Sequence, residues 1–295
     1  MRREFIGILT AAAVFTALAL IAGVLGPVLP QGDSFAVFRG EAAVFLCLLA
    51  LLLWVLRARR RAAGFGLLAG AALASLAPYW LSAPANASAE AGIALYQKNV
   101  SYRLIDNAAI AADIVATSPD IVTLQEVTPQ NRAVLNQLPA AYITRHHCTR
   151  AGLAVVSIYP AIPGTALCTE PRGLAAITVE TPQGPLRILS LHLHWPWPDE
   201  QAPQVARLME TLEAGDAPTV VGGDFNMVRW SHTLRRIAKA TGTHPVGRPT
   251  ATLPAPGLLM GGLAIDHVLA PGPGTLETRP RFGSDHLGLL ARFRL

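Results

Sequence analysis

The sequence predicts an α+β fold with mixed sheets for residues 93–295, preceded by an apolar helical region at residues 1–82. Strand-like and helix-like runs follow one another without strict alternation after residue 93. Two apolar runs, 174–181 and 185–194, flank the turn sequence PQG and indicate an antiparallel hairpin. A strictly parallel sheet has no such hairpin, which favours mixed sheets packed in layers.

The N-terminal region accounts for the unusual composition. The 295-residue chain is 52% hydrophobic and only 15% charged, with a mean hydropathy of +0.38, which is too apolar for an ordinary soluble domain. Residues 5–26, 42–56 and 62–82 contain no charge. Because a bilayer-spanning helix needs about 20 apolar residues, we expect three transmembrane helices. The second fits least well, since Arg39 and Glu41 lie at its outer end.

The positive charges predict an orientation. Arg2 and Arg3 precede the first run, and four arginines lie between the second and third runs, at 57–61. The positive-inside rule places both segments in the cytoplasm. Three crossings then deliver the chain after about residue 83 to the other side. We therefore expect a multi-pass protein of a cell inner membrane, with a periplasmic or other extracytoplasmic domain and the lipid bilayer as a partner. A cleaved signal peptide is the competing interpretation of the first run, and the two later runs disfavour it.

A short linker of small residues, 83–92, is expected to join this region to a single domain at 93–295. Strands are expected at 93–100, 120–127, 151–158, 174–181, 185–194, 217–223, 264–270 and 286–295. Helices are expected at 104–118, 129–138, 199–214 and 231–242. Pro129 suits the first turn of its helix, and Ser231 and Gly242 are typical residues for the two ends of the last helix.

The three cysteines and the overall charge carry further information. Cys47 lies in an apolar run, where it is expected to act as a small hydrophobic residue. Cys148 and Cys168 lie in the extracytoplasmic part, where a disulfide can persist, so we predict that they pair; two free thiols are the alternative. Residues 1–82 carry a net charge of +4 and residues 83–295 only +1. The basic pI thus reflects mostly the arginines that set the membrane topology, and it is weak evidence for a polyanionic partner.

Polar residues gather where the expected strands end. Asp224 and Asn226 are two residues apart after the strand at 217–223, so in an extended chain they point to the same side. Other strand ends carry Asn99, Gln125, Glu126, His192, His194, Asp266, His267, Ser284, Asp285 and His286. Each alone is compatible with an ordinary turn. Together they supply oxygen ligands for a divalent cation and imidazoles that can move protons or hold phosphate.

Six motifs in this order resemble the endonuclease/exonuclease/phosphatase superfamily, the DNase I-like metal-dependent phosphodiesterases. The motifs are QKNV at 97–100, LQEV at 124–127, SLHL at 190–193, GGDFN at 222–226, IDHVL at 265–269 and SDH at 284–286. The resemblance implies a four-layer α/β sandwich, in which two packed mixed β-sheets are flanked by helices. It also implies a phosphoric ester hydrolase that uses Mg²⁺ or Mn²⁺ and attack by water.

The same resemblance implies a ligand set for the metal. Glu126 is expected to be the principal ligand, with Asn99 and Asp285 beside it. Mg²⁺ commonly takes one or two carboxylates and keeps waters and substrate oxygens in its other positions.

The resemblance also implies five catalytic residues. Asp224 is expected to orient or deprotonate the attacking water, and Asn226 to hold a phosphate oxygen. His192 and His286 are expected to bind the phosphate and stabilise the charge of the transition state. Asp266 is expected to accept a hydrogen bond from His286 and favour its imidazolium.

Some alternatives remain open at this point. His194 shares a face with His192 on an extended strand, and Leu191 stands where the family often has threonine, so either histidine can be the active one. The expected function is a membrane-anchored, outward-facing phosphodiesterase. The alternatives are a lipid-headgroup or sugar phosphatase of the same fold, or a binding module without catalysis. The substrate can be nucleic acid, a lipid headgroup or a small phosphoester, and no protein partner can be inferred.

Overall fold

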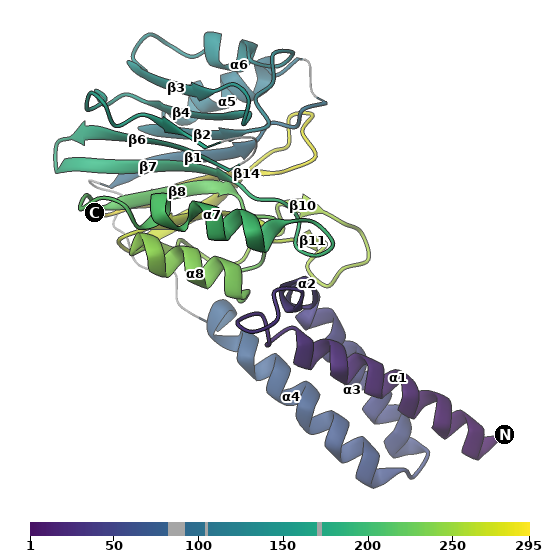
Figure 1. Ribbon diagram of the computed structural model, residues 1–295. Helices are drawn as coiled ribbons and strands as arrows, with labels where there is room; N and C mark the ends of the chain where they lie inside the picture. The colour runs from purple at the N-terminus through teal and green to yellow at the C-terminus, as the bar shows by residue number, and fades with distance from the viewer. Residues whose placement is uncertain (82–91, 104–105, 170–172) are drawn as a thin grey trace.

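The computed structural model describes residues 1–81, 92–103, 106–169 and 173–295. It consists of a helical bundle and a layered α/β domain, with the N-terminus at the far end of the bundle (Figure 1). The predicted linker, 83–92, lies outside the described residues except for Gly92.

The helical region buries alanines and leucines between its helices and leaves many large apolar side chains exposed. Its helices are α1 (Arg2–Ala22), α2 (Gly32–Val37), α3 (Arg39–Val55) and α4 (Arg59–Leu81). Ala13, Ala43 and Leu46 are fully buried between the helices, whereas Phe15 and Leu67 are 73% and 77% exposed. Among the described residues, α1 and α4 are the two helices long and apolar enough, by length and composition alone, to cross a membrane. The 17-residue α3 is shorter, and the short α2 was not expected.

The described part of the α/β domain contains two six-stranded mixed sheets and a small two-stranded one. The first sheet has, in spatial order, β13 (Gly274–Arg279), β14 (Gly288–Phe293), β1 (Ile93–Asn99), β2 (Ile121–Gln125), β4 (Leu153–Ser157) and β3 (Thr144–Cys148). The second has β5 (Leu167–Cys168), β6 (Leu174–Thr181), β7 (Gly184–His192), β8 (Thr219–Asp224), β12 (Asp266–Ala270) and β9 (His244–Pro245). The small sheet pairs β10 (Leu253–Pro254) with β11 (Gly262–Leu263). β6 and β7 form the expected antiparallel hairpin.

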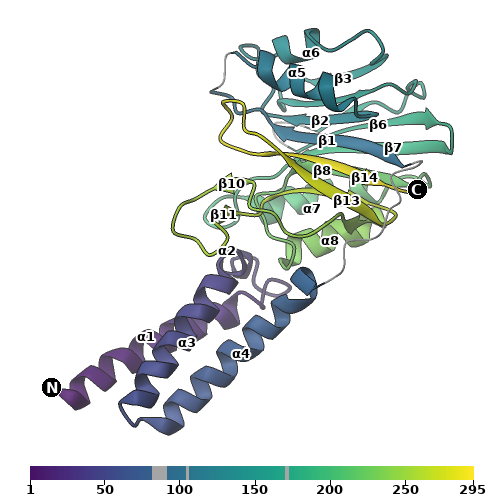
Figure 2. The same cartoon turned by 180° about the vertical axis from the view of Figure 1, so that it is seen from behind.

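The two large sheets pack face to face over a continuous apolar core that includes Leu95, Ile121, Ile188 and Val268. Helices α5 (Ala108–Thr117) and α6 (Ala133–Asn136) cover the outer face of the first sheet. Helices α7 (Gln201–Glu213) and α8 (His232–Thr241) cover the outer face of the second, as Figures 1 and 2 show from opposite sides. The predicted α+β four-layer sandwich is confirmed.

The differences from the predicted elements lie at edges and loops. The helix expected at 129–138 is reduced to the single turn of α6, because Asn131 is used to close a loop: its side chain bonds to Thr128 N, Glu126 O and Ser101 O. The edge strands β3 and β13 were missed, since neither shows the clear apolar alternation of a strand with one buried face.

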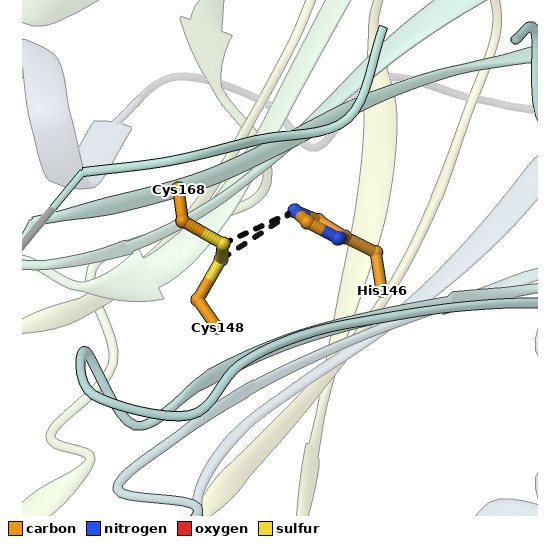
Figure 3. Close-up of side chains that lie close together, drawn as sticks. All are labelled: His146, Cys148 and Cys168. Carbon is orange, nitrogen blue, oxygen red and sulfur yellow. Dashed lines mark hydrogen bonds between the residues drawn. A yellow bond between two sulfur atoms is a disulfide. The ribbon is translucent and has the colours of Figure 1, made fainter. Parts of the chain in front are cut away.

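The disulfide between Cys148 and Cys168 is present, as predicted. Cys148 belongs to β3, at one edge of the first sheet, and Cys168 to β5, at one edge of the second. The bond therefore joins the two sheets covalently. The ring of His146 lies beside it, with Nε2 3.4 Å from Cys148 Sγ and 3.6 Å from Cys168 Sγ (Figure 3).

The bundle docks on the domain through polar contacts of α2. The two carboxylate oxygens of Asp33 accept hydrogen bonds from the backbone N–H groups of His232 and Thr233 at the start of α8, each at 2.8 Å. The indole Nε1 of Trp230 donates to Ala36 O at 2.6 Å. A methyl group on Gly26 would lie 2.6 Å from Asp33 Oδ1, so this position requires glycine. These contacts hold the bundle and the domain in a defined relation.

We predict that Asp33→Ala destabilises this junction, because two N–H groups of α8 lose a charged acceptor. The expected cost is about 1–2 kcal/mol, as for the loss of a helix cap. The measurement is thermal unfolding of the full chain in detergent, with the exposed Asp199→Ala as a control. Equal midpoints for the two variants would contradict the role given to Asp33.

Candidate active site

At one end of the sandwich, the ends of inner strands from both sheets bring polar side chains together. Asn99 ends β1, which runs parallel to β2, and Glu126 follows the last residue of β2. In the second sheet His192 ends β7 beside Asp224, the last residue of the parallel strand β8. Asp266 opens the antiparallel strand β12 and lies opposite Asp224. The convergence expected from the sequence is therefore produced by strand register and sheet packing.

Asn99 links two carboxylates. Its Nδ2 donates to Glu126 Oε1 at 3.1 Å and to Asp224 Oδ2 at 3.0 Å. The Nε2 of His192 lies 3.9 Å and 3.8 Å from these same two oxygens. The other oxygen of Glu126 accepts the backbone N–H of Tyr102 at 2.7 Å. Residues from both sheets thus surround one point between Glu126 and Asp224.

Asp266 and His286 form a buried hydrogen-bonded pair. The Nδ1 of His286 lies 2.7 Å from Asp266 Oδ2, and Gln97 Nε2 donates to the other carboxylate oxygen at 3.0 Å. The backbone N–H of Asp266 donates to Thr252 Oγ1. The free nitrogen of the ring, His286 Nε2, lies 3.9 Å from Asp224 Oδ2. The pair is therefore fixed in orientation and directs Nε2 of the imidazole towards Asp224.

The charges of these groups are strongly coupled. Burial alone would lower the pKa of His286, but the neighbouring carboxylates, Asp266 first and then Asp224, raise it to about 10. Burial opposes the ionisation of Asp266, yet the charge of His286 and the hydrogen bonds hold its pKa below the usual value. Burial, followed by the charge of Asp266, raises the pKa of Asp224 to about 7. The site thus combines an imidazolium with a carboxylate that can accept a proton near neutral pH.

The backbone at this edge adopts unusual conformations. Glu126 and Asn226 have positive φ angles of 60° and 48°, which are uncommon for residues other than glycine and cluster at functional sites. The backbone N–H of Asn226 donates to Asp224 Oδ1, and its side-chain nitrogen donates to Leu193 O. A methyl group on Gly222 would lie 2.2 Å from Thr123 Oγ1 in the first sheet, so a glycine lets β8 approach that sheet closely.

Two buried polar residues that position the site, Gln97 and Lys98, were given no role from the sequence, although they belong to the motif QKNV. Gln97 donates to Gln125, and Gln125 donates to Ser190 in the other sheet. Lys98 is fully buried, and its Nζ donates to His286 O and Pro280 O; burial lowers the pKa of Lys98 to about 8. The available signal was the polar triplet QKN at the end of the apolar strand β1.

The predicted metal ligand Asp285 lies at the margin of the cluster. Asp285 is exposed and lines a hollow of about 550 Å³ together with Ser101, Arg103 and Arg281. The two arginines were not singled out from the sequence, and they bring positive charge next to the cluster.

Of the two candidate histidines, His192 is the one whose ring lies beside Glu126 and Asp224. The backbone of His194 bonds to the side chains of Gln204 and Gln201.

The donor set fits a divalent metal ion. Glu126 and Asp224 direct carboxylate oxygens towards the same atom of Asn99, and hard oxygen donors from one or two carboxylates are what Mg²⁺ uses in proteins. Burial and then the charge of Asp266 raise the pKa of Asp224, and a cation nearby would favour its ionised form. Asp224, Asp266 and His286 also place ligand atoms within 4.8 Å of one another. The hydrogen bond between Asp266 and His286 already engages two members of this group, so Glu126, with Asn99 beside it, is the better candidate to hold the ion.

A family model covers this whole arrangement. The model described as Endonuclease/Exonuclease/phosphatase family matches residues 96–286, from within β1 to His286. The chain belongs to this family. All eight predicted site residues lie within the matched range. A comparison with curated proteins found no match.

Solved structures of family-like proteins have the same fold at low sequence identity. TDP2 of D. rerio in complex with a single-strand DNA product has a TM-score of 0.55 and 16% identity, over 70% of this chain and 100% of its own. Sphingomyelinase C from Streptomyces griseocarneus has a TM-score of 0.50 and 15% identity, over 69% and 100%. A beta toxin from Staphylococcus aureus with bound magnesium ions has a TM-score of 0.51 and 14% identity, over 69% and 100%. Each of these structures is matched over its whole length by about 70% of this chain.

We predict that Asp266→Asn lowers the pKa of His286 from about 10 towards the ordinary histidine value of about 6.5, because burial then acts without its main opposing charge. The measurement is the pH dependence of the ¹⁵N shifts of the His286 ring in protein kept in EDTA. Asp113→Asn, at another buried carboxylate, is the control and leaves this titration unchanged. A His286 that still titrates near pH 10 without Asp266 would contradict the pairing.

Proposed function

We propose that the chain is a membrane-anchored hydrolase that cleaves phosphoesters by water attack with Mg²⁺ or Mn²⁺. Membership of the family supports the reaction class. The observation that carries the proposal is the position of Asp224, whose Oδ2 accepts from the same Asn99 Nδ2 as Glu126 and lies 3.9 Å from Nε2 of His286. This arrangement provides a proton acceptor and a proton donor that face the same point.

Glu126 would hold the metal, with Asn99 and Asp285 beside it. The carboxylate of Glu126 is oriented by the Tyr102 N–H and the Asn99 amide. A bound cation would polarise the phosphoryl group and offset its developing negative charge. The magnesium ions of the beta toxin support the choice of metal class.

Asp224 would take the proton of the attacking water, and Asn226 would hold a phosphate oxygen. His286, held as an imidazolium by Asp266, would donate from Nε2 to the phosphate or to the departing oxygen. His192 would donate to a second phosphate oxygen from the other side of the cluster. Preorganised donors of this kind stabilise the charge that develops in the transition state.

The anchoring would have the N-terminus in the cytoplasm, three helices across an inner membrane and the α/β domain in the periplasm. The exposed large apolar side chains of α1, α3 and α4 support this topology, and so do the arginines at 2–3 and 57–61. The Cys148–Cys168 disulfide is the kind of bond that persists outside the cytoplasm.

The proposal predicts that the full chain in detergent hydrolyses bis-p-nitrophenyl phosphate with Mg²⁺ or Mn²⁺ and that EDTA abolishes the turnover. Asp224→Ala is expected to lower kcat by about 10²–10⁴-fold, the usual contribution of an acid–base group. His194→Ala, two residues beyond His192, is the matched control and keeps most of the activity.

Asp224→Ala, His192→Ala and His194→Ala are measured beside the wild type at several metal concentrations. Metal-independent turnover, or full activity in Asp224→Ala, would contradict the assignment. A large loss in His194→Ala with an unaffected His192→Ala would transfer the phosphate-binding role to the other histidine.

A further inference from the structure

An apolar pocket lies where the helical bundle meets the α/β domain. Its volume is about 270 Å³, and it is lined by Leu73, Leu76 and Trp80 from α4 and by Leu259, Met260 and Leu263 from the segment around β11. Glu41 is the only charged side chain among the described residues that line it. Leu73 and Leu259 are 38% and 59% exposed, so the pocket is open to the outside.

The pocket continues the apolar outer surface of the bundle. Leu67 and Phe45, on the two helices that form one wall of the pocket, are 77% and 50% exposed. Such a surface needs an apolar medium, which a bilayer supplies under the proposed topology. The bundle joins the domain at this end (Figures 1 and 2), so the pocket would lie at the membrane surface. Acyl chains of bilayer lipids are the apolar groups available at this position.

The segment that forms the other wall also reaches the candidate active site. Thr252, at the base of the β10–β11 hairpin, accepts a hydrogen bond from Asp266 N through Oγ1 and one from Leu287 N through its carbonyl. Leu259 and Met260, in the loop between the two strands, line the pocket. One hairpin therefore contacts both the buried Asp266–His286 pair and the apolar pocket.

The second connection runs through the segment that follows β8. Asn226 belongs to the predicted site, and Val228 and Trp230, which come directly after it, line the pocket. Trp230 also donates its indole N–H to Ala36 in the docked helix α2. The pocket and the site are thus built on the same two chain segments.

We infer that this pocket holds an acyl chain of the substrate, which is a phosphoester lipid of the bilayer. The inference rests on the proposed function and names its substrate class. In the reaction, the oxygen of a water molecule bonds to phosphorus, the bond from phosphorus to one ester oxygen breaks, and that oxygen leaves with a proton. The lipid tail remains in the pocket while its phosphate group reaches the cluster around Asp224.

The charge of the domain favours a lipid over nucleic acid. Residues 83–295 carry a net charge of only +1, whereas binding to a nucleic acid depends on many neutralised phosphates. Arg103 and Arg281, beside Asp285, provide two positive charges at the hollow next to the site. Two positive charges are enough to balance the charge of a single phosphate group.

The test compares two tryptophan substitutions on the same helix. Leu73→Trp fills the pocket, whereas Leu67→Trp changes an exposed residue that does not line it. The full chain in dodecyl maltoside micelles is assayed on dioleoyl phosphatidic acid, on dioleoyl phosphatidylglycerol and on water-soluble bis-p-nitrophenyl phosphate. For whichever lipid the wild type cleaves, Leu73→Trp is expected to lower the turnover at least tenfold. Its turnover of the soluble ester is expected to be unchanged. Leu67→Trp is expected to change neither.

Unchanged turnover of the soluble ester also shows that Leu73→Trp is folded. A binding readout is independent of turnover: phosphatidic acid with a diazirine at the end of one acyl chain is expected to label α4 or residues 259–263 in the wild type, and several-fold less in Leu73→Trp. Wild-type lipid turnover in Leu73→Trp, or cleavage of the soluble ester with neither lipid cleaved, would overturn the inference and leave the proposed function standing. A wild type that cleaves none of the three would refute the proposed function.

Discussion

The hydrogen-bonded pair of Asp266 and His286 is the contact on which the site depends. His286 precedes a strand of the first sheet and Asp266 opens a strand of the second, so the pair joins the two sheets at one edge. Removing one partner of a buried ion pair costs about 3–5 kcal/mol, whereas a well-packed apolar replacement of both is often at least as stable. Stability alone therefore does not explain the pair. Its effect is to hold an imidazolium beside Asp224, where the charge of His286 works against the burial that raises the pKa of that carboxylate.

The sandwich has two kinds of interface between its sheets. Along most of the strands the contact is apolar, with Leu95, Ile188 and Val268 in one core. At the edge that carries the site the contact is polar, with Asn99 bonded to Asp224 and Gln125 to Ser190. Buried polar groups are costly unless they are fully paired, and these are paired across the sheets. The β10–β11 hairpin links the helical bundle to the site, because its loop faces α4 at the apolar pocket and Thr252 at its base bonds to Asp266.

Much of this could be predicted from the sequence. Polar residues at strand ends, such as Asn99 and Asp224, are visible because they interrupt apolar runs, and the motif order supplied the family. The disulfide followed from the number and position of the cysteines. The buried network of Gln97, Lys98 and Thr252 could not be predicted, since a polar residue inside a strand does not reveal its partner on the other sheet. The apolar pocket could not be predicted either, because it depends on how the bundle docks on the domain. This docking uses the contact of Asp33 with residues about 200 positions away in the sequence.

The central claim, that water attacks phosphorus at the cluster around Asp224, can be tested most directly with isotopic oxygen. The full chain is allowed to hydrolyse bis-p-nitrophenyl phosphate in H₂¹⁸O with Mn²⁺ for a limited time, and both products are analysed by mass spectrometry. The account predicts one ¹⁸O atom in p-nitrophenyl phosphate and none in p-nitrophenol. Label in the p-nitrophenol, or no metal-dependent product at all, would contradict it.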